Sequence, residues 1–340
     1  MHHNLTSNYY RSIYCILLGL FLAMPTSSLL AQEPTAENVD LNSIEQKASF
    51  LRVAKSDGKP ISLQTSISRF RPKTGDLVVD LIGAIHIGES SYYKNLNRQF
   101  ELYDVVLYEL VAPKGTRIPR GGKPASQLSS NPLSIVDWMQ GQAQQYLGLG
   151  SQLNLIDYQK KNLVHADLSP AEMARKMEQR GDTAWSIGMS AMQEIMQKQR
   201  QLMEKNSKNQ SFQSLQEMSS LEVFAMLENP LQLKQFLAEQ FAQTGRETGL
   251  GTKLDQLIIA DRNEAAMKVL DEQIKKGKTK IAIFYGAAHM PDFEDRLVND
   301  FRLHKTKQVW VDAWDLTQSK GKSLGGVSSS LMNIFKELAK

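Results

Sequence analysis

The sequence predicts an α/β fold in which a mixed central β-sheet is flanked by helices, with a large helical insertion between its two halves. Nearly continuous apolar runs at residues 76–85 and 104–111 are typical of strands that are covered on both faces. A helix-like segment, SSYYKNLNRQFELY, lies between them. Strand, helix and strand in this order indicate a parallel α/β unit. A long helical stretch at about 169–248 follows before the α/β pattern returns.

The strands before this unit show a different pattern. FLRVAK and ISLQTSISRFR alternate between apolar and polar residues and are separated by the turn-forming DGKP. This alternation predicts an antiparallel hairpin with one solvated face, which begins near Phe50.

The insertion and the second half are expected to begin at clear helix signals. Residues 162–173 predict a short strand and then a helix with Ser169 as N-cap and Pro170 in its first position. Asn229 and Pro230 are expected to start another helix in the same way. The second half is predicted to contain a helix at about 254–275, a strand at 280–289, a helix from Pro291 and a strand at 308–314.

The N-terminus resembles an export signal. An apolar run follows Arg11, and residues 1–31 end at a possible cleavage point after Ala31. We therefore expect a periplasmic or secreted protein without an integral membrane span after signal removal, although an uncleaved anchor is an alternative. Residues 32–47 are expected to form a linker, residues 48–320 a single domain, and residues 321–340 a Gly/Ser linker with a short amphipathic helix.

Composition narrows the chemistry that is available. The 40 Lys and Arg residues against 36 Asp and Glu residues give a net charge of only +4, and the charges are spread along the chain, so we expect no nucleic-acid partner. Cys15 is the only cysteine and lies inside the signal segment. Chemistry in the mature protein must therefore use histidine, carboxylate, arginine or hydroxyl groups.

Two similar turns are the most informative feature. Gly-Ala-X-His occurs at 83–86 and again at 286–289, each time between an apolar strand and the start of a helix. Ligands of open α/β sheets bind beyond the carboxyl ends of strands, which is where His86 and His289 are expected. Gly83 and Gly286 allow close backbone approach or an unusual φ, and we expect them to lie against substrate. A nearby helix N-terminus favours neutral imidazole.

Three further residues complete the predicted site. Glu109 follows apolar residues at the end of a strand, where a carboxylate must be paired, protonated or bound to a metal. Arg262 interrupts the apolar stripe of its helix, and an inward arginine needs an anion such as Glu109, Asp261 or a substrate oxyanion. Asn263 beside it is a candidate for ligand orientation or for a structural hydrogen bond.

Other features have two interpretations each. His165 and Asp167 lie at a predicted strand end, and we expect them to form a structural pair. Glu89, after the first histidine turn, is expected to support a histidine or to place a charge at a helix N-terminus. The methionine-rich helices of the insertion are interpreted as core, with a substrate-gripping lid as the alternative.

The ordered set GAIHIGESSYY, YEL, ADRN and GAAH resembles the TraB, GumN and Tiki superfamily. The resemblance covers about residues 76–300 and excludes 112–248. It implies a Tiki-like metal-dependent hydrolase, often described as a metalloprotease, with His86, Glu109 and His289 around a metal or water and Arg262 near the substrate. The wider superfamily also resembles erythromycin esterases and a haem-binding lipoprotein.

The predicted function is therefore an exported hydrolase of amide or ester bonds that acts on a peptide or small molecule. Two imidazoles and one carboxylate suit manganese, cobalt, zinc or iron. Metal-bound water would attack a carbonyl while Arg262 stabilises the oxyanion, whereas without metal Glu109 and a histidine would act as general bases. The sequence has no HExxH helix, which excludes a thermolysin-like site. The alternatives are a non-catalytic binding protein for a peptide, metal or haem, and a scaffold with structural histidines.

Overall fold

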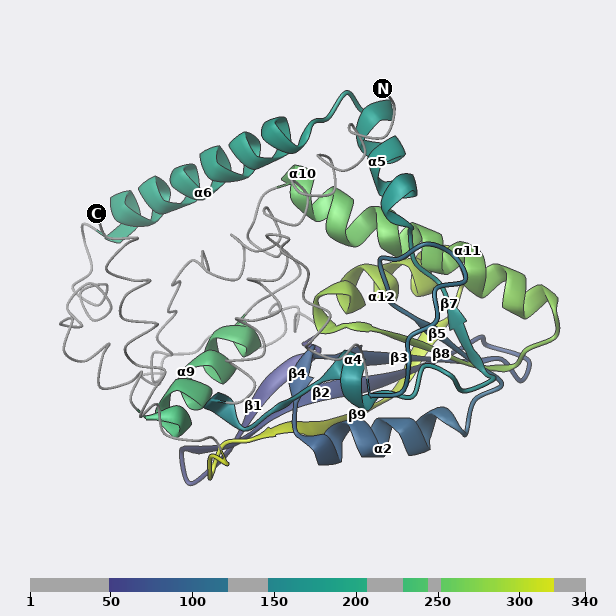
Figure 1. Cartoon of the computed structure of the whole chain (residues 1–340), viewed down its shortest axis with the longest axis horizontal. Helices are drawn as coiled ribbons and strands as arrows, with labels where there is room; N and C mark the ends of the chain where they lie inside the picture. The colour runs from purple at the N-terminus through teal and green to yellow at the C-terminus, as the bar shows by residue number, and fades with distance from the viewer. Residues whose placement is uncertain (1–48, 122–145, 207–228, 244–251, 321–340) are drawn as a thin grey trace, which may run out of the picture.

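A mixed seven-stranded sheet forms the centre of the protein in a computed structural model that describes residues 49–121, 146–206, 229–243 and 252–320 (Figure 1). The strands are β1 Leu51–Ser56, β2 Lys59–Arg71, β3 Val78–Ala84, β5 Val105–Tyr108, β7 Leu163–His165, β8 Lys280–Gly286 and β9 His304–Asp315. Their order is β1-β2-β3-β8-β5-β7, and β9 pairs with β2. This arrangement confirms the predicted mixed α/β sheet. The expected signal, linker and C-terminal tail lie outside the described residues.

The N-terminal hairpin forms at the predicted place, but the expected solvated face is not present on β2, where Thr65, Ser66 and Ser68 are buried. β1 and β2 pair antiparallel, and Asp57 and Gly58 connect them with φ values of 49° and 74°. Positive φ at both central residues suits the twist of a tight hairpin. β9 runs antiparallel to β2 and begins at His304, earlier than the predicted 308.

The central strands are parallel, but their order was not predicted. β8 pairs with β3 on one side and with β5 on the other, so the two strands of the first α/β unit are separated by a strand from the second half. In the register of β3 and β8, Ala84 lies opposite Gly286. The two Gly-Ala-X-His turns therefore leave adjacent strands at the same edge of the sheet.

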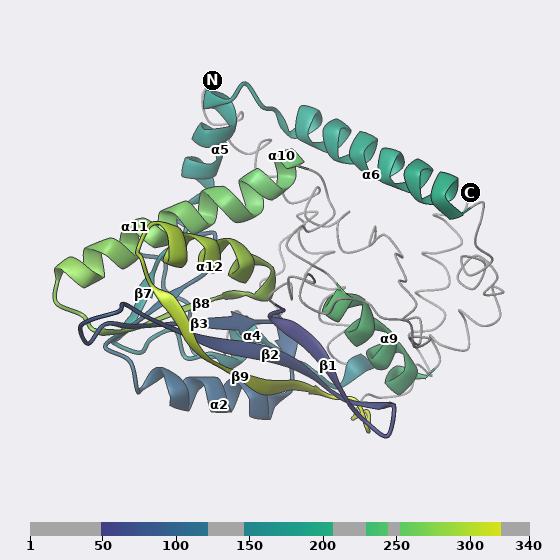
Figure 2. The ribbon, with the colours of Figure 1, turned by 180° about the vertical axis from the view of Figure 1, so that it is seen from behind.

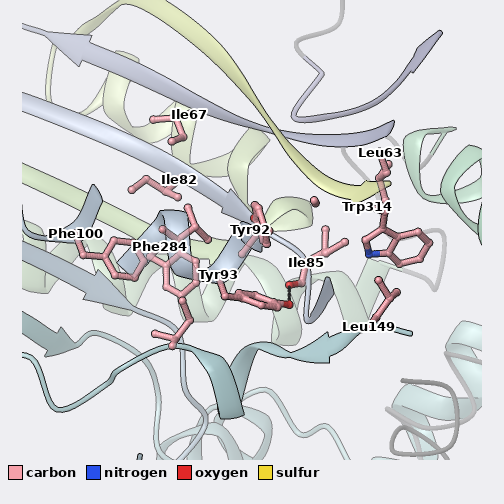
Figure 3. Close-up of a cluster of buried hydrophobic side chains, with 14 of the residues drawn as sticks. Leu63, Ile67, Ile82, Ile85, Tyr92, Tyr93, Phe100, Leu149, Phe284 and Trp314 are labelled. Atoms are coloured by element: carbon pink, nitrogen blue, oxygen red, sulfur yellow. Dashed lines mark hydrogen bonds between the residues drawn. The ribbon is translucent and has the colours of Figure 1, made fainter. Parts of the chain in front are cut away.

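Helices cover the sheet on both faces (Figure 2). α2 (Ser90–Phe100) packs on one face, where Tyr92, Tyr93 and Phe100 join buried residues of β3 and β8 such as Ile82 and Phe284 (Figure 3). α11 (Asp261–Lys275) and α12 (Met290–Asn299) pack on the other face. Every residue of β3 is buried, as expected for a strand between two helical layers.

The described part of the insertion contains α5 (Pro170–Gln179), α6 (Ala184–Asn206) and α9 (Pro230–Gln243). Ser169 and Glu172 form a capping box at α5, which confirms the predicted N-cap. The Asn229 side chain likewise accepts bonds from the first amides of α9. Short elements complete the fold: β4 Ile87–Gly88, β6 Gly150–Ser151 and α4 Gln152–Leu155.

The methionines of the insertion whose burial the structure describes fall into two groups. Met173 and Met177 are buried in a third apolar cluster with residues of the helix that leads to Arg262, which agrees with the core interpretation. Met189, Met192 and Met196 on α6 are exposed, as is Trp185. No helix in the described parts of the chain is both long and apolar enough to cross a membrane.

Candidate functional site

The predicted residues gather at the carboxyl ends of β3, β5 and β8. His86 follows β3 and has an exposed side chain, whereas Glu109 lies one residue beyond β5. His289 is the last residue of a 3₁₀ turn (η4, Ala287–His289) that directly follows β8, and it is 4% exposed. The site therefore has one solvated side at His86 and one buried side at His289.

Glu109 is held by two donors. Its Oε1 accepts from Arg262 Nη2 at 2.6 Å, and its Oε2 accepts from the backbone N–H of Gly286 at 2.7 Å. Burial raises the pKa of the Glu109 carboxyl, but the Arg262 guanidinium, the nearby imidazoles and the Gly286 amide outweigh this effect. Together they hold the pKa well below its ordinary value, so Glu109 is a carboxylate at neutral pH.

Arg262 points inward, as predicted, and joins two carboxylates. Its Nε and Nη2 donate to Asp167 at 3.0 and 2.7 Å, while Nη2 also donates to Glu109. Burial lowers the pKa of Arg262, but Glu109 and Asp167 raise it far more. Most of its donors are thus occupied. Nη1 lies 3.5 Å from the Ile258 carbonyl oxygen, the longest of these contacts.

Asp167 corrects two of our expectations. It does not pair with His165, whose Nε2 lies 2.6 Å from the Leu110 carbonyl oxygen. Its side chain is 0% exposed and binds Arg262 through both oxygens. Asp261, the other anion considered for Arg262, binds Lys176 and Arg180 of the insertion instead. Asp167 therefore belongs to the site.

A π-helical turn (η3, Gln256–Ala260) positions the helix that carries Arg262 and Asn263. It lies between α10 (Thr252–Asp255) and α11 and shifts the helical register immediately before Arg262. Such insertions are common at functional sites. The carbonyl groups of this turn accept from side chains: Ile258 from Arg262 and Ala260 from Arg296.

Asn263 determines which nitrogen of His289 carries the proton. Its Nδ2 donates to the His289 carbonyl at 3.0 Å and to Asp292 Oδ2 at 2.8 Å, and both of these partners only accept. The amide oxygen of Asn263 must therefore face His289 Nδ1, 2.6 Å away. Nδ1 carries the hydrogen, and the neutral ring has its lone pair on Nε2.

The lone pair of His289 points toward Glu109. Nε2 lies 3.6 Å from Oε1, and burial is the main reason that the pKa of His289 is lowered to about 4. His289 is consequently neutral at pH 7, as expected, although burial rather than a helix dipole is the principal cause. A lone pair this close to a carboxylate oxygen is a favourable position for a cation.

His86 is oriented in a similar way from the solvated side. Its Nδ1 lies 3.3 Å from Gln152 Oε1, and Gln152 donates through Nε2 to the Tyr158 hydroxyl at 3.0 Å. Gln152 is 4% exposed. Each imidazole thus has a side-chain amide oxygen beside Nδ1. No local motif singled out Gln152, because its partner lies 66 residues away.

The two glycines have different roles. A Cβ atom at Gly286 would lie 3.4 Å from Glu109 Oε2, 3.7 Å from His289 Cδ2 and 3.8 Å from His86 Nε2. A Cβ at Gly83 would instead meet Ser66, Met290 and Ala287. Neither glycine has a positive φ, so close approach is the relevant property. Gly286 leaves space between the three predicted ligands, whereas Gly83 serves packing.

The donor chemistry of this space suits a divalent cation. Glu109 and Asp167 carry two negative charges against one on Arg262, while His289 is neutral. Two ligands at tetrahedral angles on one zinc ion are roughly 3.4 Å apart. The 3.6 Å between His289 Nε2 and Glu109 Oε1 is close to this value. Among the described residues, however, no three His, Cys, Asp or Glu side chains are grouped closely enough to hold an ion.

Comparisons of the chain with protein-family models, curated proteins and solved structures found no match. The resemblance to the TraB, GumN and Tiki superfamily therefore depends on the four short motifs alone.

Proposed function

We propose that this chain is an exported hydrolase of amide or ester bonds that uses a divalent metal ion. The observation that carries the proposal is the approach of the His289 Nε2 lone pair to the ionised Glu109 carboxylate, beside the space that Gly286 leaves open. This arrangement favours a cation, and the exposed His86 lies beside the same space.

The protonation states favour metal-assisted chemistry over general-base chemistry by Glu109 or His289 alone. A general base works best when its pKa lies near the working pH. The pKa of His289 is about 4 and that of Glu109 is well below its ordinary value, so both are weak proton acceptors near pH 7. Neutral imidazole and ionised carboxylate are, however, the forms that bind metals.

His86, Glu109 and His289 would hold the ion. A bound divalent ion supplies a nucleophilic water near neutral pH and polarises the substrate carbonyl. Arg262 and the Gly286 amide keep Glu109 ionised and in place. Asn263 keeps the His289 lone pair directed into the site. Nη1 of Arg262 is the group that we assign to a developing oxyanion.

The test combines elemental analysis of the purified full chain with a screen of peptide and ester substrates. We expect a bound manganese, cobalt, zinc or iron ion and turnover that EDTA abolishes and the metal restores. His289→Ala should lose both metal and turnover. His304→Ala, which removes an exposed histidine on β9, is the matched control and should lose neither.

Two results would change the conclusion. Turnover that survives in His289→Ala would refute the proposed site. Bound metal or haem without turnover of any substrate would favour the non-catalytic binding protein that uses the same crevice.

A further inference from the structure

Lys234 on α9 is a buried lysine that pairs with a carboxylate from a distant part of the sequence. Its side chain is 1% exposed, and its Nζ lies 2.7 Å from Oε1 of Glu89, whose side chain is 13% exposed. Burial of an ammonium group is costly unless a carboxylate compensates it. The partner is 145 residues away in the sequence, in the loop that carries His86.

The backbone of that loop is held closely on the side of β9. The Glu89 amide donates to the Ala313 carbonyl at 2.9 Å, and Trp314 Nε1 donates to the Ile87 carbonyl at 2.7 Å. A Cβ at Gly88 would lie only 3.2 Å from Tyr92 and 3.3 Å from the Ala313 oxygen. Residues 87–89 therefore have little room to move relative to β9 and α2, and they follow His86 directly in the chain.

Glu89 also has an alternative partner. It is the N-cap residue of α2, yet its side chain makes no capping bond and extends to Lys234 instead. The first amides of a helix attract a carboxylate both by hydrogen bonding and by the helix dipole. Without Lys234, the Glu89 carboxylate would be free to turn back toward the first amides of α2.

α9 itself packs beside β1 and β2, which holds Lys234 in place (Figures 1 and 2). Gln235 donates to the Leu316 carbonyl at 2.8 Å, and Phe241 packs edge-on against Trp314. Lys55 on β1 and Glu239 on α9 form a second ion pair, 2.9 Å long, that is half-exposed and does not contact the His86 loop.

We propose that Lys234 is a positioning residue for His86: through Glu89, the insertion helix α9 fixes the loop that presents this imidazole to the space beside Gly286. The proposal rests on the proposed function only for its catalytic consequence. The position of His86 is a property of the folded protein and is measurable without turnover.

The experiment compares Lys234→Met, Lys234→Arg and Lys55→Met in the full chain labelled with ¹⁵N-histidine. In Lys234→Met, the imidazole signals of His86 should move or broaden, while those of His304 remain unchanged. Lys234→Arg keeps the charge and should largely restore the His86 signals. Lys55→Met removes the exposed ion pair of the same helix and should leave them as in the wild type.

A double variant, Glu89→Met with Lys234→Met, guards against simple unfolding. Replacing both members of a buried ion pair with apolar residues is often neutral for stability, so this variant should fold. Its His86 signals should still differ from those of the wild type. Wild-type His86 signals in the folded double variant would overturn the proposal.

Turnover provides the second measurement. If His86 is displaced, kcat should fall by about tenfold to 100-fold while KM changes less than about twofold. An inactive wild type would refute the proposed function. The His86 signals of the variants would then test by themselves whether Lys234 positions His86. An active wild type with unchanged kcat and unchanged signals in the double variant would refute the role of Lys234 alone.

Discussion

Gly286→Ala separates the function of the site from the stability of the fold. The new methyl carbon would lie 3.4 Å from Glu109 Oε2, 3.7 Å from His289 Cδ2 and 3.8 Å from His86 Nε2. These are ordinary van der Waals distances, so the methyl group fits. It occupies the space between the three predicted ligands, however, and a metal ion must lie within about 2.2 Å of its oxygen and nitrogen ligands. The ion and the methyl group therefore compete for the same volume.

The backbone should accept this change without strain. Gly286 has φ −52° and ψ 142°, which an alanine readily adopts, and its amide still donates to Glu109. Alanine at such a position stabilises the folded state by about 0.4–1 kcal/mol because it restricts the unfolded chain. We expect metal affinity to fall by up to about 100-fold, as for strong perturbations of ligand surroundings. This loss corresponds to about 2.8 kcal/mol of binding free energy.

Urea unfolding of the metal-free protein and metal titration together test this prediction. Gly83→Ala is the matched control, because its methyl group would contact Ser66, Met290 and Ala287 rather than the charged groups. It should bind metal as the wild type does. If folded Gly286→Ala binds metal and turns over substrate normally, the ion does not lie where we infer it, and the reasoning from the glycine space is refuted.

Three further predictions concern the partners of the site. Between pH 6.5 and 4, the unfolded chain protonates His289 but the folded protein does not, so this residue lowers stability with decreasing pH by up to about 3 kcal/mol. In urea unfolding of the metal-free proteins, His289→Asn should lose less stability over this range than the wild type does, by about that amount. Asp167→Asn removes one of the two buried carboxylates that pair with Arg262, so the free energy of unfolding in urea should fall by about 3 kcal/mol. A decrease of less than about 0.5 kcal/mol would contradict the buried ion pair. Asn263→Leu removes the acceptor that keeps the proton of His289 on Nδ1, so both neutral tautomers should be populated. Metal titration should then show an affinity about 10–100-fold weaker. If ¹⁵N spectra of the variant still show only the Nδ1–H tautomer, Asn263 does not select it.

Local patterns predicted most of the elements because they depend on neighbouring residues. Each of these signals involves residues that are close together in the sequence: the alternation of β2, the apolar run of β3 and the capping box of α5. The order of the strands does not follow from neighbouring residues. β8 comes after the insertion in the sequence, yet it lies between β3 and β5 and pairs with both. The first four residues of β9 were missed because His304 and its polar neighbours pair through their backbone with β2, which leaves no apolar pattern.

The difference between local and long-range signals also explains which site residues could be predicted. Glu109 and Arg262 were identifiable because a charged residue within an apolar pattern is unusual wherever it occurs. Glu109 was among the anions expected for Arg262, but Asp167 was not, because no local pattern links two residues that lie 95 positions apart. Lys234 has no local signal at all, since a lysine within a helix normally faces solvent.

The register of β3 and β8 explains why His86, Glu109 and His289, which are far apart in the sequence, lie around the space beside Gly286. Because Ala84 lies opposite Gly286, each turn places its histidine near the end of the other strand, and β5 delivers Glu109 beside them. A shift of one residue in either parallel pairing would reverse which side chains face each helical layer, so the apolar packing of β8 opposes it. The geometry of the site is therefore fixed by the core beneath it, and the polar contacts from Asn263, Gln152 and Arg262 only orient groups that the sheet has already brought together.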